Sequence, residues 1–407
     1  MVRALSIFAV TYLLMSKPHW PIVQLDRPSA GLIGAVLMIA ARVLTPEQAY
    51  RAVDWNTIIL LLGMFLLSGS LRLAGFFDWA ADTLLIRVYT PTALLTALVF
   101  VSGLLSALLV NDTVCVMLAP LVIAMIERSD LPVIPYLFAL ATGANIGSVM
   151  TVVGNPQNMI IAHAAPLSYV EFARVLAPIG LVNLALTVAL LRWIFRDDLK
   201  TQTIALRSGS TSVLDCPFLI KTLTCLALVI VGFVSGLPLA WTALGGATAL
   251  LVISGRSPRQ IMGEVDGPLL LFFGALFVIV AGLEAGHVLA IASRWFTPLF
   301  HAPGLLGVVH FSWVSVLASN IVSNVPYVLV AGRWITDGAD VDRQWLLLAL
   351  TSTFAGNLTL FGSVANVIVF ETARKHARVG FWEFLRIGVP VTVLTTVVGV
   401  ALLLIWS

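Results

Sequence analysis

The chain has 407 residues, of which 59% are hydrophobic and 11% are charged, and its formal net charge is +3. Soluble domains carry about 25% charged residues, so this composition excludes a soluble globular protein and predicts an all-α polytopic membrane protein. The net charge is small and by itself says nothing about nucleic acid, and no nucleic-acid partner is expected for a membrane protein of this kind. The three cysteines are unpatterned and show neither a disulfide framework nor metal-site spacing. No metal and no cofactor is expected.

The apolar segments of the first half predict three spans, a short helix, an interrupted segment, a broken span and a closing span. Their ranges are about 3–17, 28–44, 55–73, 78–88, 91–127, 132–164 and 170–195. The interrupted segment carries Asn111 and Asp112 between two apolar runs, so a re-entrant helical hairpin is expected over 91–127. A hairpin that leaves on the side where it entered gives this half five crossings.

The second half repeats the pattern of the first. A shift of 212 residues places Asn145 on Asn357 and Pro178 on Pro390. The second set of segments covers about 219–236, 240–254, 267–285, 287–298, 303–335, 345–376 and 382–406. The expected domains are a first transmembrane repeat at 1–200, a polar linker at 201–214 and a second repeat at 215–407. Because five is odd, the two repeats should have inverted topology, each with a re-entrant hairpin (91–127; 303–335) and a discontinuous helix (132–164; 345–376).

The basic residues predict the orientation of the chain in the membrane. Under the hairpin arrangement, most of the 23 Lys and Arg residues fall on the face that carries the linker. Positive charge concentrates on the cytoplasmic side of membrane proteins. The linker is therefore expected in the cytoplasm and both termini outside, in a cell membrane of the bacterial inner-membrane type.

Polar residues interrupt the apolar segments at matching places in both halves, for example in "GANIGS" (Gly143–Ser148) and "GNLTLFGS" (Gly356–Ser363). Irregular backbone at membrane depth leaves peptide groups without partners, which costs several kcal/mol each, so it survives where it lines a cavity. Inverted-repeat transporters build their sites from such breaks. The alternative is helix packing, because Gly and Pro are frequent in membrane helices. The expected substrate-binding residues are Asn111, Thr113, Asn145, Gly147, Ser148, Asn155, Asn158, Ser323, Asn324, Asn357, Thr359, Gly362, Ser363 and Asn366.

Asp112 is the acid expected at this site. An intramembrane carboxylate indicates a functional role, here the binding of a coupling proton or sodium ion. An equally open reading is that Asp112 caps the second hairpin helix. Backbone carbonyls near the helix breaks would complete the coupling-ion site, which is predicted at Asp112, Gly143, Ala144, Asn145, Gly356 and Asn357. Asp54 and Asp266 are read as N-caps of the third spans.

These motifs resemble those of the ion transporter superfamily. "SNV" at Ser323–Val325, "GNPQN" at Gly154–Asn158 and "GSVAN" at Gly362–Asn366 resemble motifs of its dicarboxylate carriers. "NDT" at Asn111–Thr113, followed by "GANIGS", resembles its arsenite-permease and uncharacterised anion-permease branches. The superfamily includes divalent anion/sodium symporters, arsenite efflux permeases, sodium/proton antiporters and citrate-transporter-like permeases. The resemblance implies transport of a carboxylate, sulfate or oxyanion by an elevator-like motion, and a possible homodimer.

The expected function is secondary active transport of a small anionic solute across the lipid bilayer, coupled to H⁺ or Na⁺, with alternating access around a midplane site. Two alternatives of the same fold are an arsenite or antimonite efflux permease and a sodium/proton antiporter. A channel is a further alternative that the sequence does not exclude. A membrane-embedded enzyme would need acidic residues, histidines or metal ligands that converge at one membrane face. In this sequence such residues are scattered along the chain, so no enzyme is expected. The substrate, the coupling ion, the direction of transport and the oligomeric state are left open.

Overall fold

The computed structural model describes residues 1–16, 25–129, 131–200, 213–300, 304–335 and 340–406, and these residues form helices joined by short connections. The predicted linker, 201–214, lies outside the described residues except for its last two positions. Within the described ranges, seven helices are long and apolar enough to cross a membrane, namely α4, α6, α10, α11, α14, α16 and α20. The helical structure agrees with the predicted class.

The helices follow the predicted order in both halves. The first half contains α1 (Val2–Ser16), α2 (Arg27–Ala40), α3 (Pro46–Ala52), α4 (Trp55–Leu73), α5 (Phe76–Arg87), α6 (Pro91–Leu108), α7 (Asn111–Arg128), α8 (Val133–Ser148), the short η1 (Val152–Gly154), α9 (Pro156–Ala164) and α10 (Tyr169–Ile194). The second half contains α11 (Cys216–Val234), α12 (Leu239–Ile253), α13 (Pro258–Met262), α14 (Gly267–Ala285), α15 (Val288–Phe300), α16 (Gly304–Val322), α17 (Asn324–Ala331), η2 (Gly332–Trp334), α18 (Val341–Ala355), η3 (Leu360–Gly362), α19 (Val364–Thr372) and α20 (Phe381–Trp406).

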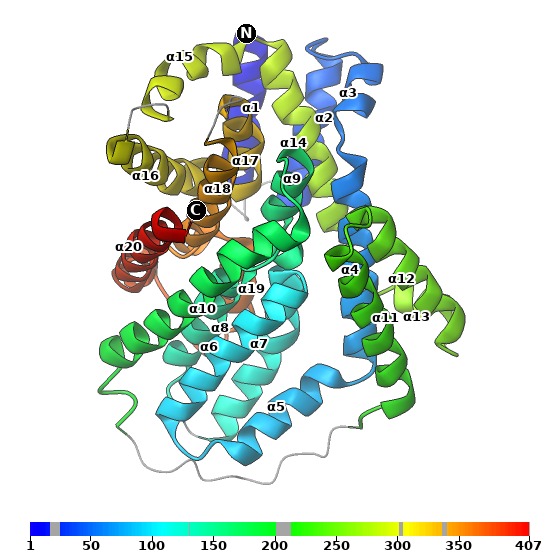
Figure 1. Cartoon of the computed structure of the whole chain (residues 1–407), viewed down its shortest axis with the longest axis vertical. Helices are drawn as coiled ribbons and strands as arrows, with labels where there is room; N and C mark the ends of the chain where they lie inside the picture. The colour runs from blue at the N-terminus through cyan, green and yellow to red at the C-terminus, as the bar shows by residue number, and fades with distance from the viewer. Residues whose placement is uncertain (17–24, 130, 201–212, 301–303, 336–339, 407) are drawn as a thin grey trace.

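The two halves interleave. Helix α2 packs against α14 and α12 packs against α4, while α7 packs against α19 and α9 against α17. Figure 1 shows α5, α6 and α7 together at the lower end of the molecule and α15, α16 and α17 toward the upper end, with α8 and α19 between them. Segments far apart in the sequence therefore meet in the middle of the molecule.

The N-caps of α4 and α14 are as predicted. The Asp54 carboxylate accepts a hydrogen bond from the backbone N–H of Asn56 at 3.0 Å, and the Asp266 carboxylate accepts one from Leu269 at 2.9 Å. Each bond satisfies one of the amide groups that the first turn of a helix leaves unpaired. Both aspartates therefore fix where the helix begins.

Each interrupted segment is a helix, a break and a second helix. In the first, α6 gives way to α7 through Leu109 and Val110, which have extended backbones. In the second, the break between α16 and α17 is at Ser323, whose φ of +69° is rare for a residue with a side chain. Strained backbone of this kind is concentrated at ligand sites and switch regions.

The predicted break at Gly143–Ser148 is wrong, because α8 continues to Ser148 and the irregular loop begins at Val149. The glycines there serve helix packing. A Cβ atom at Gly143 would lie 2.7 Å from the carbonyl oxygen of Val99 in α6, and one at Gly147 would collide with the backbone of Gly103. Small residues let membrane helices approach this closely. In the second half, α18 ends at Ala355, next to the predicted break at Gly356.

Candidate functional site

A small polar pocket lies where the two interrupted segments meet the two broken spans. We call it the central pocket. Its volume is about 30 Å³, enough for a water molecule but too small for a solute of several heavy atoms. Its lining comes from α7, α8, α9, α14, α17, α18, η3 and α19 and comprises Asn111, Asp112, Asn145, Ser148, Pro156, Gln157, Phe272, Phe273, Ser323, Asn324, Val325, Thr353, Gly362, Ser363 and Val364.

The structure divides the predicted site residues into three groups. Eight line the central pocket: Asn111, Asp112, Asn145, Ser148, Ser323, Asn324, Gly362 and Ser363. Six are not part of this lining and lie in the loops at the ends of α8 and α18 and the first turns of α9 and α19: Asn155, Asn158, Gly356, Asn357, Thr359 and Asn366. The remaining four are Gly143, Ala144 and Gly147, which lie inside α8, and Thr113, which lines a neighbouring cavity.

The Asn145 side chain joins the two broken spans. Its amide nitrogen donates to the side-chain oxygens of Asn357 at 3.0 Å and Asn366 at 2.9 Å. Its oxygen accepts from the amide of Asn111 at 3.3 Å and the hydroxyl of Ser363 at 2.9 Å. All four partners are buried, so these bonds replace hydration that the apolar surroundings cannot supply.

This network fixes the orientation of the Asn111 amide. The Asn366 amide nitrogen donates to two backbone carbonyls, which leaves its oxygen to accept from Asn145. Asn145 then presents its own oxygen to the Asn111 amide nitrogen. The Asn111 side-chain oxygen, at the break between α6 and α7, is left without a partner among the described residues. So is the side-chain oxygen of Asn324, at the break between α16 and α17; we call these two breaks the tips. The pocket therefore offers unused hydrogen-bond acceptors from both tips.

The structure excludes the capping role for Asp112. The N-cap residue of α7 is Val110, and Asp112 lies within the first turn of the helix. The Asp112 side chain instead lies near the backbone of Ala365, in the first turn of α19, whose N–H donates to the Ser363 hydroxyl at 3.2 Å. A carboxylate at a helix N-terminus meets unpaired amides and the positive end of the helix dipole. Asp112 is thus a buried acid placed between the two halves.

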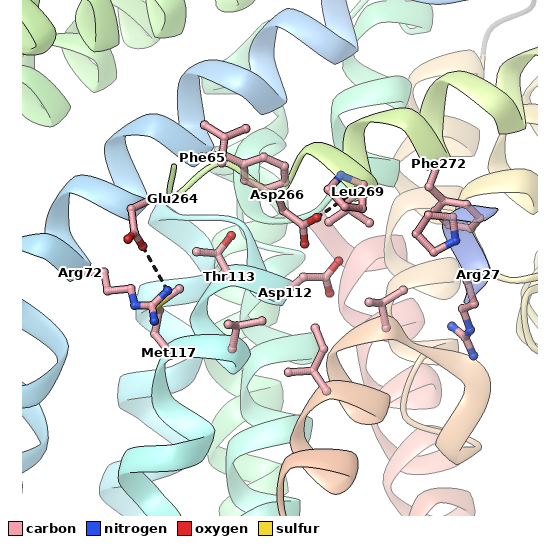
Figure 2. Close-up of a pocket in the computed structure, with 16 residues that line it drawn as sticks. Arg27, Phe65, Arg72, Asp112, Thr113, Met117, Glu264, Asp266, Leu269 and Phe272 are labelled. Atoms are coloured by element: carbon pink, nitrogen blue, oxygen red, sulfur yellow. Dashed lines mark hydrogen bonds and ion pairs between the residues drawn. The ribbon is translucent and has the colours of Figure 1, made fainter. Parts of the chain in front are cut away.

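Asp112 also lines a second, larger space of about 410 Å³, which we call the Arg27 cavity (Figure 2). Arg27 and Asp266 face Asp112 from α2 and from the start of α14. At the other end of the cavity, Arg72 forms a 3.1 Å ion pair with Glu264. Within the described residues, Arg27 has no carboxylate within ion-pair distance. The cavity connects the coupling-ion candidate with charged groups of the surrounding helices.

Sequence reasoning missed several lining residues. Gln157 stands inside the "GNPQN" motif and could have been included on that ground, whereas Thr353 comes one turn before the predicted break in α18. Phe272 and Phe273 lie in the second turn of α14, within a span whose sequence is uniformly apolar. Arg27 reaches the site only through the packing of α2 on α14, which no local pattern reveals.

Broken helices that enclose a buried polar pocket within a helical membrane protein are typical of secondary transporters. The chain belongs to the citrate transporter family, whose sequence model matches residues 10–355. This confirms the predicted resemblance to the ion transporter superfamily, and the expectation of a multi-span membrane transporter rather than an enzyme.

Several known proteins are similar to the chain over nearly their whole length. A 46 kDa membrane protein of Mycobacterium leprae (strain TN) is 33% identical, over 97% of this chain and 96% of its own. A silicon efflux transporter of Oryza sativa subsp. japonica is 30% identical, over 97% and 96%. The inner membrane protein YbiR of Escherichia coli (strain K12) is 30% identical, over 96% and 99%.

A solved structure supports the fold. The crystal structure of the YdaH transporter of Alcanivorax borkumensis matches with a TM-score of 0.58, over 100% of this chain and 96% of that one. The sequence identity is 16%, so this likeness concerns the fold alone.

Proposed function

We propose that this secondary transporter carries a small oxygen-rich solute, of the oxyanion or carboxylate class, by alternating access around the central pocket, with H⁺ or Na⁺ as the coupling ion. The observation that carries the proposal is the meeting of Asn111 and Asn324, from two different tips, with the loops of both broken spans. Buried amides and hydroxyls at such a meeting point can replace the hydration shell of a solute. The small volume implies that the pocket widens when the solute binds.

The same proposal includes the arrangement of the chain in the membrane. We propose two inverted-topology repeats of five spans, at 1–200 and 215–407, with the hairpins 91–127 and 303–335 re-entrant from opposite faces. The linker would be cytoplasmic and both termini outside. The positions of α6–α7 and α16–α17 toward opposite ends of the molecule support this arrangement (Figure 1). A homodimer and an elevator-like motion follow from the family resemblance.

A second candidate, an uncharged hydroxylated solute such as arsenite or antimonite in its hydroxide form, has its own support. The described lining of the central pocket contains no Lys, Arg or His side chain, and it contains the acid Asp112. The unpartnered oxygens of Asn111 and Asn324 need hydrogen-bond donors. Hydroxyl groups supply donors, whereas a fully ionised anion has none. An anion would need Asp112 to take a proton first, which would couple its transport to H⁺.

The experiment is flux into proteoliposomes. Purified protein is tested with phosphate, sulfate, arsenite, succinate and citrate, each under a pH gradient and under a sodium gradient. A carrier gives saturable flux and counterflow for at least one solute. Flux that rises without saturation would indicate a channel, and sodium/proton exchange without any solute would indicate an antiporter.

Asp112→Asn tests the coupling role. Arg27 and Asp266 face this carboxylate, and the Arg72–Glu264 pair lies farther along the cavity, so each contributes to its charge environment. If protonation of Asp112 couples transport, Asp112→Asn abolishes the dependence of flux on pH. The matched control is Asp78→Asn, at an exposed acid in α5, which leaves the pH profile unchanged. An unchanged profile in Asp112→Asn would refute the role of this residue.

A further inference from the structure

Arg27 is a charged residue whose presence is not explained by its own helix. It lies in the first turn of α2, where the positive end of the helix dipole disfavours a cation. The neighbouring Asp26 does not neutralise it, because the Asp26 carboxylate caps α2 by accepting the Ser29 N–H at 2.9 Å and lines a different cavity. A role for the Arg27 guanidinium is therefore to be sought outside α2.

The Arg27 guanidinium also has no protein partner. Within the described residues it forms neither a hydrogen bond nor an ion pair. The side chain is only partly exposed, and the lining of the Arg27 cavity to which it belongs is mostly apolar. A guanidinium has five N–H donors, and leaving them unpaired in apolar surroundings is costly. An anionic ligand would supply the missing acceptors.

The charges at the opposite end of the cavity are already engaged. The Arg72–Glu264 ion pair neutralises itself, and the Asp266 carboxylate caps α14. Figure 2 shows Arg27 and Arg72 entering the cavity from opposite sides, with Asp112 between them. In the described lining, the positive charge without a partner is therefore that of Arg27.

The Arg27 cavity is large enough for a solute, whereas the central pocket is not. Its volume of about 410 Å³ falls within the range of about 300–1,000 Å³ that is typical of small-molecule sites. Asp112, Phe272 and Val364 line both spaces, so the cavity and the central pocket adjoin at these residues. A solute in the cavity is thus held next to the polar groups of both tips.

We propose that Arg27 binds the ionised group of the solute, and that the Arg27 cavity is where a carboxylate or oxyanion is held beside the central pocket. The proposal rests on the proposed secondary transport and selects a negatively charged solute over an uncharged hydroxide. A guanidinium fits a carboxylate or phosphate group with two parallel N–H···O bonds. The apolar lining strengthens this attraction, because electrostatic interactions are less screened where water is excluded.

The acid Asp112 does not prevent this binding. It lies beyond ion-pair distance from Arg27, which leaves room for an anion to contact the guanidinium without contacting the carboxylate. Electrostatic interactions weaken with distance, so the attraction of a contact pair exceeds the repulsion from a more distant charge. A hydroxyl group of the solute could in addition donate a hydrogen bond to Asp112.

The first test is anion binding to variants of Arg27, measured by isothermal titration calorimetry in detergent micelles at low ionic strength. The probes are citrate, succinate, phosphate and sulfate. Arg27→Gln should raise the dissociation constant of the best-bound probe by about 10–100-fold, the usual strength of a hydrogen bond to a charged group. Arg27→Lys keeps the charge without the paired N–H geometry, so its affinity should lie between those of the wild type and Arg27→Gln.

The matched control is Arg333→Gln. Arg333 is exposed, forms a 3.0 Å ion pair with Glu284 and does not line the cavity, so this variant should bind the anion as the wild type does. Equal affinities of the wild type and Arg27→Gln would overturn the inference. A wild type that binds none of the four anions would overturn it as well.

The second test needs no variant and therefore holds even if Arg27→Gln does not fold. Phenylglyoxal modifies arginine side chains, and mass spectrometry of the digested protein follows the modification of each arginine. The best-bound probe should slow the modification of Arg27 but not that of Arg333. Equal rates of Arg27 modification with and without the anion would contradict the assignment.

The outcomes separate this inference from the proposed function. Anion binding that depends on Arg27, in a protein that moves no solute, refutes the transport proposal alone. Saturable flux of a solute whose binding is the same in Arg27→Gln as in the wild type refutes the inference alone.

Discussion

Asn145→Ala should destabilise the folded protein strongly, because this side chain holds the two broken spans together. It donates to Asn357 and Asn366 and accepts from Asn111 and Ser363. The substitution removes four hydrogen bonds and leaves their partners in place.

The magnitude follows from where those partners lie. Hydrogen bonds between membrane helices contribute ~0.6 kcal/mol each on average, so four give about 2.4 kcal/mol. Asn111 and Ser363 line the central pocket, where water can replace the lost bond. Asn357 and Asn366 are fully buried outside that lining, and a buried acceptor left unpaired costs about 1–3 kcal/mol. The expected loss is therefore about 2–4 kcal/mol.

The measurement is the free energy of unfolding in mixed micelles, titrated with denaturing detergent. The control is Asn183→Ala, because Asn183 is also fully buried but, among the described residues, its amide donates only to the Ile179 carbonyl of its own helix. This control should lose less than about 1 kcal/mol. Equal losses in the two variants would refute the claim that Asn145 connects the two halves of the site.

Three further predictions concern helix packing, capping and burial. Gly147→Ala should cost about 1–3 kcal/mol because a Cβ collides with α6, whereas Gly274→Ala, whose added Cβ meets no described atom of another element within 4 Å, should be near neutral in the same unfolding assay. Asp54→Ala should cost about 0.5–2 kcal/mol through loss of the α4 cap, and Asp54→Asn should restore most of it; equal losses would refute the capping role. A maleimide should label the exposed Cys216 but not the buried Cys115 until the protein is unfolded, as mass spectrometry would show.

The sequence predicted the order of the helices and the polar set at the centre because both depend on local chemistry. An apolar run of sufficient length forms a helix wherever it packs, and Asp54 or Asp266 begins one through its own side chain. Polar residues such as Asn111 and Asn324, placed between apolar runs, must find a cavity or partners. Helix formation, helix capping and the pairing of buried polar groups depend on local sequence. The sequence pattern alone could therefore indicate which polar residues would meet at the centre of the molecule.

The position of the first break could not be predicted in the same way. Glycine permits a turn, and it also permits two helices to touch, and the two uses look alike in sequence. At Gly143 and Gly147 the second use holds, because α6 lies against this face of α8. The charged residues of the Arg27 cavity also could not be predicted from local sequence, because tertiary packing brings them together. Arg27 and Glu264 lie far apart in the chain and reach one cavity only because α2 and α4 pack against helices of the other half.

The bonds around the pocket also bear on how access could alternate. Asn145 bonds to Asn357 and Asn366, and Asn155 bonds to Thr353, so the two broken spans are tied to each other at several points. Separating them would break these buried bonds at once, at a cost that grows with each unpaired group. In contrast, Asp112 in α7 and charged groups carried by α2, α4 and the start of α14 line one open space, the Arg27 cavity (Figure 2). We therefore expect the broken spans and tips to move as one body against those helices, with the Arg27 cavity widening or closing as they move.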